Sequence, residues 1–171
     1  FDNLYYVLLN QAFSPDYGGN QFLTYAKLAA TLTGDYIFYG CSNLDSVELN
    51  YTTYLGQQTF GDCVNLKNIN TPEVTKIDQA VYAICTSLII LPKLTSLDYT
   101  LDGDSPLTDI YIPLCERIGD TVGNDLILDE ITGRILTLTI PSALMTCNGG
   151  NPDGDIQYLQ ANNTVTIIQI P

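Results

Sequence analysis

The stretch "TFGDCVNLKNINTPEVTKID", Thr59 to Asp78, decides the fold because its apolar pattern recurs on both sides. An aromatic residue, a cysteine and two aliphatic residues follow one another three positions apart, at Phe60, Cys63, Leu66 and Ile69. One copy precedes this pattern and another follows it, and the step from Phe38 to Phe60 equals the step from Phe60 to Tyr82. We call this spacing the regular step. The earlier copy is Phe38, Cys41, Leu44 and Val47, and the later copy is Tyr82, Cys85, Leu88 and Leu91.

A second pattern begins at a proline within each copy. Pro72, Val74 and Ile77 recur as an equivalent set from Pro92 and again from Pro113. The step from Pro72 to Pro92 is two residues shorter than the regular step, so the third copy has lost two residues near its expected strand. A looser copy, "LTLTIPSALM" (Leu136 to Met145), repeats "TDIYIPLCERI" (Thr108 to Ile118) after a longer step. We therefore expect an insertion around Asp125 to Gly133.

A period of about 20–29 residues with recurring leucines is typical of a leucine-rich repeat. One turn cannot bury its own apolar side, so successive turns must stack. Equivalent residues then lie about 4.8 Å apart and fill the same slot of one core. The sequence predicts a leucine-rich repeat solenoid of about five turns, with short parallel β-strands and irregular or 3-10 connections. We expect one structural domain, with a cap or lead-in at 1–32, repeats at 33–147 and a C-terminal cap at 148–171.

These residues resemble the BspA-type leucine-rich repeat family, whose unit runs aromatic-x-x-Cys-x-x-Leu-x-x-Ile-x-x-Pro-x-x-Val-x-x-Ile. Phe60 to Ile77 is close to a full match, with Val74 one position early. The resemblance covers about 35–118 and extends weakly to Cys147. It implies adhesion or ligand binding rather than catalysis, in bacterial surface or secreted proteins, some parasites or phage tail-associated proteins. The family has no fixed motif of binding residues, so none is carried over.

The composition excludes several classes of partner. The chain of 171 residues has a net charge of −13 and contains no histidine. Nucleic acid and anionic lipid need Lys or Arg to neutralise phosphate, so neither is expected to bind. No apolar run is long enough to insert into a membrane. Without histidine or a nucleophile–base motif we expect no enzyme activity, and no cofactor is predicted. The first residue is Phe1 and no signal peptide is visible, so we expect a fragment or a processed chain.

The recurring cysteines are interpreted as small buried hydrophobic residues. Five cysteines cannot all pair within one chain, and no C-x-x-C motif is present. Cys115 supports the packing interpretation because it aligns with Val74 and Leu94. A ladder of disulfides or metal ligands is the alternative, although parallel side chains in equivalent slots give poor S–S geometry.

Ligand binding is predicted on the exposed side of the strands. In each strand the residue between two core positions must point outward. A strip of polar, aromatic and aliphatic side chains suits carbohydrate or protein contact, whereas an ordinary solvated sheet face is the alternative. The strip consists of Ser46, Glu48, Asn68, Asn70, Ile90, Asp109, Tyr111, Thr137 and Thr139.

Acidic residues give weaker candidates. Asn151, Asp153 and Asp155 have the spacing of a calcium loop but lack its closing Glu, so Asp153 or Asp155 is expected to cap a helix near 153–160. A turn at Asn162 and a strand at 164–170, buried on both faces, should follow. Residues 22–33 fit a short helix or a half-turn. The other acidic groups are interpreted as solvated loops, with calcium binding as the alternative, at Asp102, Asp104, Asp109, Asp125, Asp129 and Glu130. Asn50 and Asn162 match the N-glycosylation pattern.

Together these features predict an extracellular adhesion or ligand-recognition module of a longer bacterial surface or secreted protein. Its partner would be a protein or carbohydrate on a cell surface. Two alternatives stay open: a receptor-binding domain of a phage or virion appendage such as a tail fibre, and a purely structural spacer. The expected location is extracellular, on a cell surface or a virion.

Overall fold

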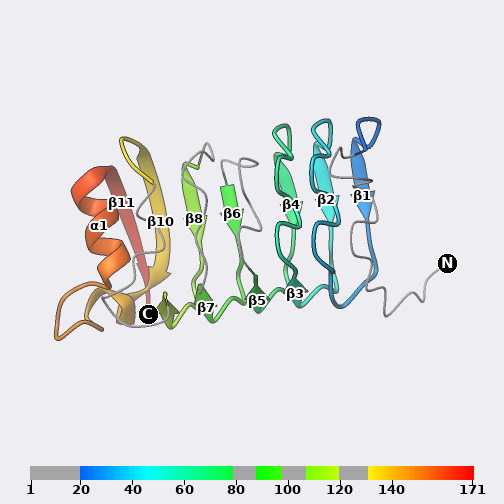
Figure 1. Ribbon diagram of the computed structural model, residues 1–171. Coiled ribbons are helices and arrows are strands. Elements are labelled where there is room, and N and C mark those ends of the chain that lie inside the picture. Colours follow the sequence, from blue (N-terminus) through cyan, green and yellow to red (C-terminus); the bar gives the residue numbers. More distant parts are fainter. Residues whose placement is uncertain (1–19, 79–87, 98–106, 120–130) are drawn as a thin grey trace.

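The computed structural model describes residues 20–78, 88–97, 107–119 and 131–171. Its strands lie side by side along one axis, in a main ladder and a second row of short strands (Figure 1). The main ladder contains β1 (Tyr25–Lys27), β2 (Ser46–Glu48), β4 (Asn68–Asn70), β6 (Leu88–Ile90), β8 (Asp109–Tyr111), β10 (Ile135–Pro141) and β11 (Thr164–Ile170). The second row contains β3 (Tyr54–Leu55), β5 (Lys76–Ile77), β7 (Ser96–Leu97) and β9 (Arg117–Ile118). A 3-10 helix, η2 (Ser142–Met145), and α1 (Gly154–Asn162) lie near the C-terminal end.

The spacing of the repeat sets the register in which the strands pair. Every pairing between these strands is parallel. Val47 pairs with Ile69, which stands one regular step further along the chain. Ile110 pairs with Leu138 across the longer step of the looser copy. The leucine-rich repeat prediction is therefore supported by the pairing, including the copy that carries an insertion.

The core is built from the recurring aromatic, cysteine and leucine residues. The Phe38 and Phe60 rings stack with centroids 5.7 Å apart and planes 4° apart. Within each turn the N–H of Cys41 donates to the Phe38 carbonyl, and the N–H of Cys63 donates to the Phe60 carbonyl. These bonds span three residues, as in a 3-10 turn. The predicted irregular connections are thus tight turns whose backbone groups are satisfied locally.

The cysteine prediction is confirmed where the structure describes these residues. Cys41, Cys63 and Cys115 are buried thiols outside any disulfide, and Cys147 is an exposed one. The Cys63 thiol donates to the Phe38 carbonyl at 3.0 Å, which satisfies a polar group inside the core. Cys85 lies outside the described residues.

The main ladder and the second row of short strands are interrupted at the same place. One sheet has the order β1-β2-β4, and the next begins at β6; likewise β3 pairs with β5, and β7 pairs with β9. The interruption coincides with the copy that has lost two residues, between Pro72 and Pro92. Across it, the Thr71 hydroxyl donates to the Ile90 carbonyl at 3.4 Å. A side-chain contact therefore stands where a continuous ladder would have backbone bonds.

The ladder begins earlier than the boundary expected from the sequence. Residues 25–27 form β1, which pairs in parallel with β2 in the register Ala26 to Val47. This strand lies before residue 33, in a segment expected to be a cap, a helix or a half-turn. The short Ala26 side chain fills the slot that Val47 occupies in the next layer, and this substitution hides the repeat.

The C-terminal elements are found where they were predicted, but one burial prediction is wrong. Asp153 is the N-cap of α1, and its carboxylate accepts the N–H of Asp155 at 3.0 Å. β11 covers the predicted range, yet Thr166 and Ile168 are exposed and Ile167 is half-buried. Thr166 and Ile168 point to the outward side of the ladder, as the exposed Tyr111 does in an inner strand, and Ile167 points inward in the last strand of its sheet among the described residues.

Substitutions in one turn test the packing. Leu66 is 2% exposed, so Leu66→Ala should lower the free energy of unfolding by about 2–5 kcal/mol through lost burial and a residual cavity. Val64 in the same turn is 55% exposed, and Val64→Ala should cost less than about 0.5 kcal/mol. Denaturant unfolding measures both values. Equal costs would contradict the assignment of inward and outward positions.

A repeated backbone strain gives a second test. Tyr36 and Gln58, which stand one regular step apart, both have positive φ angles, of 57° and 47°. A side chain makes this left-handed conformation unfavourable, and glycine adopts it freely. Gln58→Gly should therefore raise the free energy of unfolding by about 0.5–1 kcal/mol. The neighbouring Gln57 has no positive φ, so Gln57→Gly should lower it by a similar amount. Thermal or denaturant melts in which both variants move the same way would contradict this.

Candidate functional site

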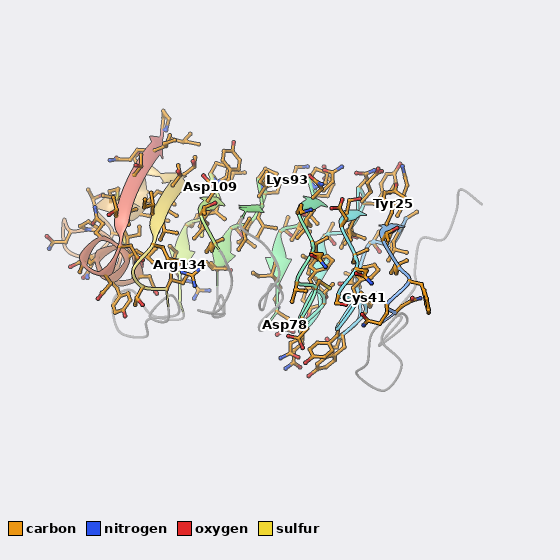
Figure 2. All side chains as sticks on the ribbon, turned by 90° about the horizontal axis from the view of Figure 1, so that it is seen from above. Tyr25, Cys41, Asp78, Lys93, Asp109 and Arg134 are labelled. Carbon is orange, nitrogen blue, oxygen red and sulfur yellow. The ribbon has the colours of Figure 1, made fainter. Side chains whose placement is uncertain are left out.

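The outward side chains of the main ladder form two rows. In each three-residue strand the middle residue is wholly or partly buried and its neighbours point away from the core. We call the two rows the strand face. The first row is Tyr25, Ser46, Asn68, Asp109, Thr137 and Thr166, and the second is Lys27, Glu48, Asn70, Ile90, Tyr111, Thr139 and Ile168. Figure 2 shows Tyr25 and Asp109 along one long side of the molecule and Asp78 on the opposite side.

Two adjoining hollows on the strand face contain all nine residues predicted from the sequence. The first has a volume of about 380 Å³ and holds five of them: Ser46, Glu48, Asn68, Asn70 and Ile90. The second has a volume of about 270 Å³ and holds Ile90 again with Asp109, Tyr111, Thr137 and Thr139. Ile90 lines both hollows and separates a polar half of the face from a more apolar half.

Glu48 is the electrostatic centre of the first hollow. Its carboxylate accepts a hydrogen bond from the Tyr25 hydroxyl at 3.0 Å and lies 2.8 Å from the Lys27 ammonium. The Lys27 bond, followed by the Tyr25 bond, lowers the pKa of Glu48 below its ordinary value. The same contacts raise the pKa of Lys27 and of Tyr25. These three groups, which come from adjacent strands, are linked by one hydrogen bond and one ion pair.

The first hollow also contains two amide side chains, Asn68 and Asn70. The Asn70 amide donates to the Asn50 side-chain carbonyl at 2.7 Å, which fixes its orientation. Asn68 is exposed, and Lys67 beside it pairs with Asp45 at 3.4 Å. The hollow therefore offers hydroxyl, amide and carboxylate groups between the Tyr25 ring on one side and Ile90 on the other.

The second hollow combines one carboxylate with an apolar surface. The Asp109 carboxylate accepts the Thr108 hydroxyl at 2.7 Å. Beside it, Ile90 is 42% exposed and Tyr111 is 38% exposed. Thr139 departs from the expectation of an open position, since it is only 8% exposed. Its register partners Tyr111 and Ile168 flank it on the neighbouring strands and cover it.

Sequence reasoning missed Tyr25, Lys27 and Lys67. Tyr25 and Lys27 belong to β1, in the segment that was expected to be a cap. A signal was present, because the step from Ala26 to Val47 is only one residue shorter than the step from Val47 to Ile69. The strand period thus extends into the N-terminal segment although the aromatic and cysteine pattern does not.

One of the three calcium candidates, Asp153, caps the helix. Asp153 is buried, and this burial raises its pKa while its carboxylate accepts backbone N–H groups at the start of α1. Asn151 is exposed. Within residues 20–78, 88–97, 107–119 and 131–171, no group of three or more His, Cys, Asp or Glu side chains is arranged to hold a metal ion. The other acidic candidates lie outside the described residues, apart from Asp109: they are Asp102, Asp104, Asp125, Asp129 and Glu130.

The glycosylation patterns lie in ordered surroundings. In the pattern that begins at Asn50, the Thr52 hydroxyl is buried and donates to the Ala30 carbonyl at 2.7 Å. In the second, Asn162 is exposed at the end of α1 and its amide donates to the Tyr158 carbonyl at 2.9 Å. Neither contact identifies a modification.

Comparison with known proteins identifies the family. A model of the BspA type leucine rich repeat region matches residues 20–124 in six copies. The chain belongs to the BspA-type leucine-rich repeat family. The match begins at residue 20 and so includes β1, in agreement with the ladder. No match to this BspA-type chain was found among the curated proteins.

A solved structure has a similar fold. It is the crystal structure of a leucine rich cell surface protein from Faecalibacterium prausnitzii A2-165, with a TM-score of 0.52 and 20% sequence identity. The similarity covers 69% of this BspA-type chain and 39% of the length of that protein. At this identity the likeness concerns the fold. In the described part of the BspA-type chain, no helix has the length and apolar character that crossing a membrane requires.

The Glu48 cluster predicts a pH dependence. Because its pKa is lowered, ionised Glu48 stabilises the fold at pH values above the ordinary range of a Glu, and this contribution is lost as the pH falls through the lowered pKa. Lys27→Met removes the strongest interaction and should raise the Glu48 pKa, as measured by NMR titration of its side chain. Lys67→Met is the matched control because Lys67 pairs with Asp45. Equal pKa changes in both variants would contradict the assignment.

Proposed function

We propose that this chain is a recognition module of a surface or secreted protein, which binds a protein or carbohydrate partner on a cell surface through its strand face. The proposal rests on the agreement between the outward positions of the sequence pattern and the hollows of the surface. The nine residues were selected from the sequence only because they should point outward. In the structure they line two hollows that meet at Ile90. A solvated sheet face without a partner needs no such hollows.

The composition of the hollows favours binding. Tyr25 and Tyr111 offer rigid rings that give large contact areas at low entropic cost. Between them lie side chains able to donate or accept hydrogen bonds, including Ser46, Asn68 and Glu48. Hydroxyl-rich ligands and extended peptides both present alternating polar and apolar groups to such a surface.

Preorganisation supports the same conclusion. The Glu48 carboxylate is already held by Tyr25 and Lys27, and the Asn70 amide is held by Asn50. Groups fixed before binding lose little conformational freedom when a ligand arrives. An extracellular location agrees with this role, since the similar solved structure is a cell surface protein of a bacterium. Binding rather than catalysis is the activity proposed.

Tyrosine substitutions at two positions test the proposal. Tyr111→Ala should weaken binding to immobilised glycans or to extended peptides by about 5- to 30-fold, because it removes the ring that lines the second hollow. Tyr51 is the matched control: its side chain is 60% exposed and lines neither hollow. Tyr51→Ala should leave binding unchanged. A glycan array and a peptide array, read for all three proteins, provide the measurement.

Two results would contradict the proposal. If neither array binds the unmodified chain above background, the strand face has no ligand of these classes and the spacer interpretation is favoured. If a calcium chelator abolishes binding while Tyr111→Ala has no effect, the site lies elsewhere on the molecule. The melting temperature of each variant should be recorded beside its binding, so that a loss caused by unfolding is recognised.

A further inference from the structure

The C-terminal end of the main ladder is incompletely covered. β11 is the outermost strand of its sheet, at the end opposite β1 (Figure 1). Val165 and Ile167 face the core but are only partly buried. Their register partners in β10, Leu136 and Leu138, are 2% and 1% exposed. The same slots therefore close fully one layer further in, whereas in the described part of the chain α1 packs beside the last layer and no further strand pairs with it.

The free edge of β11 offers backbone groups in a regular order. The N–H of Thr164 donates to the Arg134 carbonyl at 2.8 Å, so the backbone groups of Thr164 face β10. Successive residues of a strand direct these groups to opposite sides. The N–H and C=O groups of Val165, Ile167 and Gln169 consequently point away from β10. In the described part of the chain no strand pairs with this side.

The sequence of β11 carries none of the features that usually protect an edge strand from pairing. Natural edge strands are short, charged, bulged or interrupted by proline. β11 has seven residues, "TVTIIQI", without a charge, a proline or a glycine. At the opposite end, β1 has three residues and carries Lys27. One end of the ladder is thus protected and the other is open.

The charge distribution favours a second copy of the chain at the open end. The chain has a net charge of −13, yet after residue 130 it carries only Arg134, Asp153 and Asp155. Both carboxylates are buried at the start of α1. Two identical acidic molecules therefore meet with the least repulsion where these ends approach each other.

We propose that β11 pairs antiparallel with β11 of a second copy, around a two-fold axis that passes beside Ile167. Ile167 then lies opposite the partner's Ile167 and exchanges two backbone hydrogen bonds with it, while Val165 lies opposite the partner's Gln169. The inward faces of the two strands become continuous, which covers Val165 and Ile167. The β-branched residues across the new pair suit this packing. The dimer presents two strand faces, so binding to a repetitive surface gains avidity.

Sedimentation and amide exchange of the full 171-residue chain test the pairing. In the micromolar range we expect a concentration-dependent species of twice the chain's mass. In dilute solution the amides of Thr166 and Ile168 exchange slowly and those of Val165, Ile167 and Gln169 exchange fast. On dimerisation all five become slow. A chain that stays monomeric up to millimolar concentration, or forms open-ended polymers, overturns the proposal.

Substitutions at one exposed position separate backbone pairing from side-chain contact. Gln169→Pro removes an outward N–H in each copy and should raise the dimer dissociation constant at least about ten-fold. Gln169→Ala keeps the N–H and should change that constant by less than about three-fold. Equal effects of the two variants overturn the proposal.

A second variant covers the case in which Gln169→Pro does not fold. Ile167→Lys places two ammonium groups opposite each other at the two-fold axis, so it should abolish the dimer while the monomer keeps its circular dichroism spectrum. A persisting dimer overturns the proposal. Because Ile167 lies outside both hollows, binding by the monomeric variant on the arrays reports on the strand face separately.

Discussion

The structure depends on parallel pairing between residues that stand one repeat apart. Because the strand spacing is about 4.8 Å, each slot of the core must be filled by side chains that tolerate an identical or similar neighbour at that distance. Phe38 stacks on Phe60, and the thiols of Cys41 and Cys63 are buried in the same way. The outward residues follow the same rule, since the register that aligns the core also aligns the strand face.

The change of period falls within the strand face. Where the repeat is two residues short, between Pro72 and Pro92, the ladder stops after β4 and resumes at β6. The larger hollow extends across this interruption, from Tyr25 on β1 to Ile90 on β6. The second hollow lies on the strands from β6 to β10, beyond the interruption, so a change of period is not required for a hollow on this face.

The sequence was sufficient for the register and for most of the strand face, because both follow from spacing alone. Even the copy with the longest step pairs as predicted, with Thr139 beside Tyr111. The Glu48 cluster was missed because Tyr25 and Lys27 lie in a turn without the aromatic and cysteine signal, where the strand period is the one remaining sign of the repeat. The burial of β11 was predicted incorrectly because its apolar composition does not tell whether other groups pack on its outward face, where Ile168 is exposed. The covering of Thr139 likewise depends on the size of the residues beside it.

The interrupted ladder also bears on cooperativity. In a stacked repeat, each turn is stabilised mainly by the turns next to it, so the chain behaves as a row of coupled units. The hydrogen bonds of the ladder contribute to that coupling, and at the junction between β4 and β6 the described residues show side-chain contacts in their place, from Thr71 to the Ile90 carbonyl and from Lys93 to Glu73. Among the described residues, the strands from β1 to β5 and those from β6 to β11 are therefore joined by side-chain contacts and not by strand pairing. Such a junction is where a row of coupled units divides into separately unfolding segments.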